Sequence, residues 1–208
     1  MSKLANKIYS ILDKEYPETD TALEYKNAIQ LLVSTILSAQ CTDIRVNAVT
    51  KELFKKYRNV KDFAEAKTHV FEQEIKSTGF YKNKAKNIVS AAKIITKRFQ
   101  GKVPRTMEEL ITLPGVARKT GNIVLNHAYG KIEGIAVDTH VKRVSGRLGL
   151  TSNTDPVEIE KDLMSLFKKE QWGKLSNLLI DHGRAICKAR KPDCGPCVLN
   201  KMCPSADI

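Results

Sequence analysis

The chain has 208 residues, of which 35 are lysine or arginine and 23 are aspartate or glutamate, giving a formal net charge of +12. This length allows one large domain or two small ones, and the charge favours a polyanionic partner, nucleic acid or an anionic membrane surface. The sequence contains no apolar stretch that predicts a transmembrane helix and no apolar signal core at its N-terminus, so we expect a cytoplasmic protein without disulfides.

The first half of the chain predicts a series of helices, because few segments alternate with period two. The expected helices cover residues 3–16, 24–39, a segment capped by Thr42 or Asp43, 61–66, 69–76 and a segment from Asn83 to Phe99. Within the second of these, Leu31–Leu37 is apolar on most sides, so this helix should be central and buried.

The middle of the chain predicts a helix-hairpin-helix. Thr106 and Glu109 match the capping-box pattern, and the short helix that they start should stop at Leu113 because Pro114 cannot continue it. Gly115 lets the backbone turn sharply, and a second helix is expected from about residue 116 to 129.

The start of the second hairpin helix is a candidate anion site. Its unpaired N–H groups should point outward beside a glycine, where no side chain blocks the approach of a phosphate. The candidate phosphate contacts are Gly115, Val116, Ala117 and Arg118.

Lys119 borders a stripe of the same helix that is formed by Val116, Thr120, Ile123, Val124 and His127. Partial desolvation at that margin would lower the pKa of the amine and make it a nucleophile. Alternatively, the lysine stem follows the apolar margin and the ammonium reaches water, and this helix alone favours that alternative.

The last third of the chain predicts three more helices and an irregular tail. Asp138 can cap one helix, and Asp155 with Pro156 opens another by a capping pattern. A final helix is expected at residues 173–187, followed by a segment rich in Pro, Gly, Lys and Arg.

Four of the five cysteines lie close together in this tail, at Cys187, Cys194, Cys197 and Cys203, with six, two and five intervening residues. Four thiolates in a short loop select zinc or an iron–sulfur cluster, and ligand type does not decide between them. The fifth, Cys41, is expected to be a small buried apolar residue.

A basic loop formed by Lys188, Arg190 and Lys191 lies between the first two cysteines. A metal site would brace this loop, which could then neutralise DNA phosphates. The alternative is a run of charge that is merely solvated.

Taken together, these motifs resemble the endonuclease III family of helix-hairpin-helix DNA glycosylases. The motifs are Leu113–Lys119, Val137–His140 and the terminal four-cysteine spacing. The resemblance spans residues 32–203 and includes Ser38–Asp43 and Thr78–Tyr81.

The resemblance implies a base-excision-repair DNA glycosylase with AP lyase activity, acting on oxidised pyrimidines. Lys119 would attack C1′ of the deoxyribose, expel the base and form a Schiff base, and β-elimination would nick the strand 3′ to the abasic sugar. Asp138 would stabilise positive charge on the sugar or shuttle protons. From the residues alone Asp138 is a helix cap, and the two roles are compatible because a carboxylate at a helix N-terminus stays ionised.

The resemblance also implies that the four cysteines hold a 4Fe-4S iron–sulfur cluster. Gln40 would fill the gap left by the flipped nucleotide, and Phe80 would wedge between bases of the opposite strand. The partner would be double-stranded DNA with oxidised pyrimidines or abasic sites, bound by a nucleoid-associated monomer without membrane contact. Phe80, Ala117 and Cys41 stand where the family more often has leucine, glycine and a small residue.

The expected architecture is all-α, with two helical lobes and a DNA-binding cleft. Residues 22–132 would form the lobe with the helix-hairpin-helix, while 1–21 and 133–208 would form the lobe with the iron–sulfur loop. Lys119 and Asp138 would then lie on opposite walls of the cleft.

Two other functions fit parts of the sequence. An adenine-mismatch glycosylase of the same superfamily lacks the lysine nucleophile and carries a further C-terminal domain, so Lys119 and the end of the chain at Ile208 argue against it. A non-catalytic DNA-binding module would leave Lys119 and Asp138 unexplained as a pair.

Overall fold

The computed structural model describes residues 3–207, and all regular secondary structure in that range is helical, as the sequence predicts. The chain divides into two compact units. One unit is Ala22–Lys131, and of the described residues the other combines 3–21 with 132–207. Among the described residues, no helix has the length and apolar character needed to cross a membrane.

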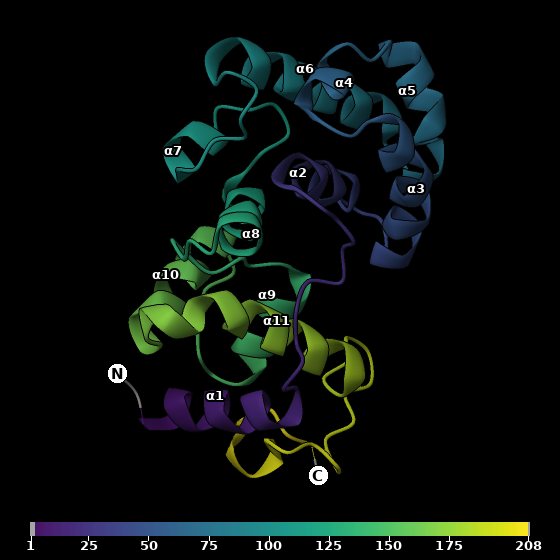
Figure 1. Cartoon of the computed structure of the whole chain (residues 1–208). Coiled ribbons are helices and arrows are strands. Elements are labelled where there is room, and N and C mark those ends of the chain that lie inside the picture. The colour runs from purple at the N-terminus through teal and green to yellow at the C-terminus, as the bar shows by residue number, and fades with distance from the viewer. Residues whose placement is uncertain (1–2, 208) are drawn as a thin grey trace. The chain divides into compact units, whose positions relative to one another are not determined.

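The unit Ala22–Lys131 is a helical bundle. Its helices are α2 (Ala28–Leu37), α3 (Asp43–Lys56), α4 (Val60–Ala64), α5 (Thr68–Glu74), the 3-10 helix η1 (Lys76–Thr78), α6 (Tyr81–Arg98), α7 (Met107–Leu110) and α8 (Arg118–Tyr129). Figure 1 shows α6 beside α4 and α5, and α2 packs against α3, α6 and α8. The predicted central position of α2 is confirmed, because every side chain from Ile29 to Leu37 is buried.

Several helices of this bundle begin at residues other than those predicted, α2 and α6 among them. α2 begins at Ala28 rather than residue 24, because the side chain of Asn27 accepts a hydrogen bond from the Gln30 N–H and caps the helix there. α6 begins at Tyr81 rather than after Asn83, because Phe80 turns the chain directly into the helix with a left-handed backbone.

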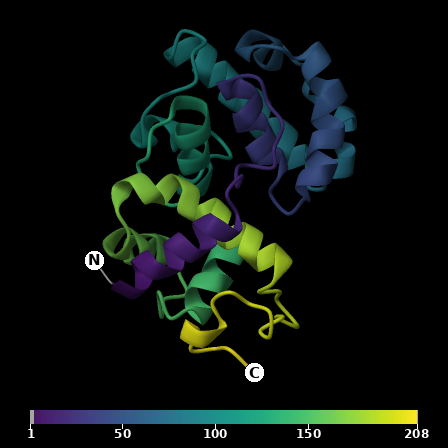
Figure 2. The ribbon, with the colours of Figure 1, turned by 60° about the horizontal axis from the view of Figure 1, so that its bottom comes forward.

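The second unit is also helical and contains α1 (Lys3–Glu15), α9 (Thr139–Arg147), α10 (Pro156–Leu166), α11 (Lys169–Ala185) and the 3-10 helix η2 (Asn200–Met202). α11 packs against α1 and α9, which can be followed in Figure 2. The predicted Asp155 cap of α10 is confirmed by hydrogen bonds from the N–H groups of Val157 and Glu158. α11 begins four residues before the predicted position, since Lys168 N–H donates to the side chain of Gln171 at that end.

Candidate functional site

The connection between α7 and α8 is longer than the sequence predicts. Thr106 caps α7 as expected, but the helix ends at Leu110 rather than at Leu113. The turn is then closed by a hydrogen bond from the Val116 N–H to the Leu113 carbonyl, at 3.1 Å. α8 begins two residues late, at Arg118, because Ala117 is still extended, with φ −100° and ψ 173°.

Two glycines allow the close packing of this hairpin. Gly115 has φ 79°, and a Cβ there would lie 3.0 Å from the Asn87 side chain of α6. A Cβ on Gly121 would lie 2.6 Å from the sulfur of Met107, so α7 packs directly on the backbone of α8. The turn is therefore held against neighbouring helices where a larger residue would displace it.

The four candidate phosphate contacts differ in accessibility. Gly115, Ala117 and Arg118 are exposed. Val116 is buried, and its N–H already donates within the turn, so it is not one of the unpaired donors that the sequence predicts. Ala117 stands at the N-cap of α8, where its methyl side chain cannot accept a hydrogen bond from the helix.

Lys119 lies in the first turn of α8 and is exposed. Within residues 3–207, its amine has no hydrogen bond or ion pair. The predicted apolar stripe is only partly correct: the buried residues of α8 are Gly121, Asn122, Val124 and Leu125. Within its own unit Lys119 is therefore an exposed side chain beside a stripe that is only partly buried.

Asp138 caps α9, as the sequence predicts. Its Oδ1 accepts a hydrogen bond from the Val141 N–H at 2.8 Å, and the residue is half-buried. In the part of the chain that the structure describes, Oδ2 has no hydrogen-bond donor. One oxygen therefore fixes the orientation of the carboxylate, and the other can interact with a ligand.

Gln40 and Phe80 are both exposed residues in left-handed turns. Their φ angles are 52° and 46°, and the Phe80 side chain is 65% exposed. Among the described residues, Gln100 is the only other non-glycine residue with positive φ. A left-handed backbone costs a residue with a Cβ about 1–2 kcal/mol, and such strain concentrates at functional sites. This signal is invisible in the sequence.

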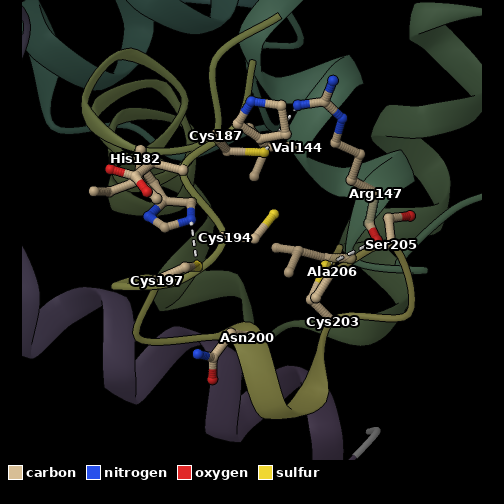
Figure 3. A pocket seen from close by; sticks show the side chains of 14 residues that line it. Val144, Arg147, His182, Cys187, Cys194, Cys197, Asn200, Cys203, Ser205 and Ala206 are labelled. Carbon is tan, nitrogen blue, oxygen red and sulfur yellow. Dashed lines mark hydrogen bonds between the residues drawn. The ribbon is translucent and has the colours of Figure 1, made fainter. Parts of the chain in front are cut away.

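The four C-terminal cysteines line a single cavity, which is shown in Figure 3. Each of the four cysteines is half-buried at this cavity. Cys41 belongs to the other unit and is half-buried against its apolar core, where the sequence predicts full burial.

Groups around this cavity are suited to thiolate ligands. Arg147 Nη1 donates to Cys187 Sγ at 3.3 Å, and His182 Nε2 lies 3.5 Å from Cys197 Sγ. Burial raises the pKa of the Cys197 thiol, a backbone hydrogen bond at Leu199 lowers it, and the three other thiols raise it further. Four adjacent thiolates therefore need a cationic centre to balance their charge.

The shape of the cysteine site bears on the kind of metal. No three His, Cys, Asp or Glu side chains among residues 3–207 are arranged to hold a single metal ion. A zinc ion requires four sulfurs at about 2.3 Å from one point, whereas an iron–sulfur cluster separates its four thiolates. Four cysteine thiols around one cavity are a donor set that either zinc or an iron–sulfur cluster can use.

The basic loop that follows the first cysteine is anchored to α9. Arg147 donates to the carbonyls of Lys188 and Ala189, at 2.7 and 2.9 Å, and Arg143 donates to the Cys187 carbonyl at 3.1 Å. The side chains of the predicted loop residues Lys188, Arg190 and Lys191 are exposed. The sequence analysis did not identify these two arginines as anchors of the loop. Their spacing of four residues places both on one face of a helix, and that spacing is visible in the sequence.

Comparisons with known proteins agree on one family. A family model described as the HhH-GPD superfamily of base excision DNA repair proteins matches residues 33–169. Endonuclease III of Synechocystis is 55% identical over 202 residues, which are 97% of this chain and 92% of that protein. Endonuclease III of Bacillus subtilis is 47% identical over 189 residues, or 90% and 86% of the two chains. A solved structure of a trapped covalent endonuclease III–DNA intermediate is 41% identical with a TM-score of 0.92, covering 99% of this chain and 98% of that one.

Proposed function

This chain belongs to the endonuclease III family of HhH-GPD base excision DNA repair proteins, and on that premise we propose how its residues act on damaged DNA. It is a bifunctional DNA glycosylase and AP lyase. Its proposed substrate is double-stranded DNA with oxidised pyrimidines or abasic sites. The observation that carries the mechanism is the exposed Lys119, which has no protein partner among residues 3–207 and lies in the first turn after the hairpin.

Lys119 is the proposed nucleophile. Its deprotonated Nζ attacks C1′ of the damaged nucleotide, the bond from C1′ to the base breaks, and the base leaves with the bonding electrons and a proton. Opening of the sugar ring then gives a Schiff base between Nζ and C1′. A base then removes a proton from C2′, the electrons of that bond form a C2′=C3′ double bond, and the 3′-phosphate leaves with the electrons of the C3′–O bond, which nicks the strand on the 3′ side.

Asp138 is the proposed partner in this chemistry. Because Oδ1 is held by the Val141 N–H, the carboxylate has a fixed direction. Oδ2 is then the atom that stabilises positive charge on the sugar, or accepts and returns a proton.

Replacing Asp138 separates its two roles. Asn caps helices about as well as Asp, so Asp138→Asn should change the free energy of unfolding by less than about 0.5 kcal/mol. Base excision, measured in single-turnover assays, should fall by about a hundredfold or more, because the charge is lost. Asp138→Ala should add a loss of stability of about 1 kcal/mol. The matched control is Asp155→Asn at the cap of α10, which should excise at the native rate; a native rate for Asp138→Asn would leave Asp138 as a cap only.

We propose that Cys187, Cys194, Cys197 and Cys203 hold a 4Fe-4S cluster. The four thiols around one cavity support this assignment. When bound, the cluster would link four points of an irregular segment and thereby keep the basic loop ordered. Lys188, Arg190 and Lys191 of that loop would contact DNA phosphates.

The remaining proposed DNA contacts belong to the unit Ala22–Lys131. The exposed Gly115, Ala117 and Arg118 at the start of α8 would bind a phosphate. Gln40 would fill the space left by the flipped nucleotide, and Phe80 would wedge into the opposite strand. With its net charge of +12, the protein is proposed to act as a monomer on the DNA of the nucleoid in the cytoplasm.

The proposed chemistry is tested by trapping its intermediate. Borohydride reduces a Schiff base to a stable amine, so incubation with thymine-glycol or abasic duplexes should give a covalent protein–DNA complex on a denaturing gel. Undamaged duplex of the same sequence serves as the control and should give none. Binding of the damaged duplex without any trapped complex would contradict the lyase mechanism, and release of adenine without a nick would indicate an adenine-mismatch glycosylase.

A further inference from the structure

Lys84 of α6 is a buried lysine that the mechanism above does not use. The residue is only 5% exposed. Nζ donates one hydrogen bond to the Leu37 carbonyl and another to the Thr78 carbonyl, both at 2.8 Å. Lysine is almost never fully buried unless it is paired, so this position is unusual and its two acceptors are informative.

The two acceptors stand at the ends of two different segments. Leu37 is the last residue of α2, and Thr78 is the last residue of η1. Carbonyls at a helix C-terminus lack partners within the helix and carry partial negative charge, so an ammonium is a suitable donor for both. Burial lowers the pKa of Lys84, and the neighbouring Cys41 opposes that change.

Each of these segments leads directly into a strained, exposed turn. Gln40 follows Leu37 by three residues, and Phe80 follows Thr78 by two. Both have left-handed backbones, at φ 52° and 46°. Such conformations persist only where the surrounding structure determines them, and Lys84 is bonded to the segments that precede both turns.

We propose that Lys84 is a positioning residue that ties the Gln40 turn to the Phe80 turn, so that both side chains enter damaged DNA in one fixed arrangement. This inference rests on the proposed roles of Gln40 and Phe80 as groups that fill and wedge the duplex. The amine does not contact the reacting sugar in this proposal. It acts through the two backbone segments to which it donates.

The first test removes the amine and keeps the length of the stem. Lys84→Met should lower single-turnover excision from a thymine-glycol duplex by about 10- to 100-fold, because misplacement by about 1 Å can cost that much. The matched control is Lys93→Met, which removes an exposed lysine from the same helix and should retain the native rate. Circular dichroism and thermal unfolding establish the folded fraction, and Lys84→Gln replaces Lys84→Met if the latter does not fold.

Fluorescence measures directly whether the two turns enter the duplex and unstack its bases. A 2-aminopurine base opposite an abasic-site analogue brightens when the protein unstacks it. At saturating protein, Lys84→Met should give less than half of the native increase. An increase equal to that of the native protein would overturn the proposal.

A double-mutant cycle distinguishes positioning from general support of the fold. If Lys84 acts through the two turns, Lys84→Met should reduce excision by less than twofold further in a protein that already carries Gln40→Ala and Phe80→Ala. Equal losses in both backgrounds would show a merely structural role and overturn the proposal. Native excision by Gln40→Ala/Phe80→Ala would instead refute the proposed roles of the turns, and the Lys84 inference with them, while borohydride trapping would still report on Lys119.

Discussion

Lys119→Gln is expected to lower both base excision and strand cleavage by at least about a thousandfold, because loss of a covalent nucleophile is among the most damaging changes to an enzyme. Glutamine keeps a polar side chain of similar reach but cannot form a Schiff base. Since Lys119 is exposed and makes no protein hydrogen bond within residues 3–207, the variant should fold with native stability. The measurement is borohydride trapping together with single-turnover cleavage of thymine-glycol and abasic duplexes.

The control for this variant tests whether charge alone matters. Lys93→Gln removes one exposed positive charge from the same unit and should trap and cleave at native rates. Lys119→Gln should still bind an abasic-site analogue. Its loss of binding affinity should not exceed the loss expected when one phosphate contact is removed. Substantial trapping by Lys119→Gln would place the nucleophile on another amine.

If the four cysteines hold the proposed cluster, Cys197→Ser is expected to remove it and to destabilise the C-terminal segment. Serine does not supply a soft thiolate ligand, so the protein should lose its broad absorption near the boundary of visible and ultraviolet light, and its iron content should fall. Loss of a bound metal centre is one of the few changes that can lower the free energy of unfolding by more than about 4 kcal/mol. Iron analysis, absorption spectra and chemical denaturation after anaerobic purification provide the measurements.

Cys41→Ser is the matched control for the cluster. Cys41 is half-buried against the core of the other unit, and its thiol lies outside the cavity formed by the four cysteines. The variant should therefore keep native absorption and iron, with a loss of stability of about 1 kcal/mol or less. Stoichiometric zinc without iron in the native protein would contradict the cluster assignment, whatever the variants show.

Most helix ends that the sequence predicted correctly depend on a side chain within three residues of the end. The caps at Thr42, Thr106, Asp138 and Asp155 are all observed. The wrong ends have local causes that were overlooked, such as the Asn27 cap of α2. The left-handed Phe80 at the start of α6 could not be predicted, because phenylalanine carries no preference for that conformation.

The predicted stripe beside Lys119 is only partly correct, since Val116 and Val124 are buried but its other residues are not. Apolar periodicity identified Thr120, Ile123 and His127, but these are only half-buried. The core side of the helix includes Gly121 and Asn122, which carry no apolar signal. Gly121 is buried because Met107 packs onto it, and that contact depends on how the hairpin folds.

By itself, the sequence determined the helical class, most of the caps, the hairpin and the order of motifs that identifies the family, since these depend on residues close together in the chain. Only the tertiary structure decided that four thiols surround one cavity, that Arg147 anchors the basic loop and that Lys84 donates to the carbonyls at the ends of α2 and η1. These features depend on donors and acceptors that are brought together by packing of the core. A buried lysine satisfied by two carbonyls is indistinguishable, as a letter in the chain, from an exposed lysine on the same helix.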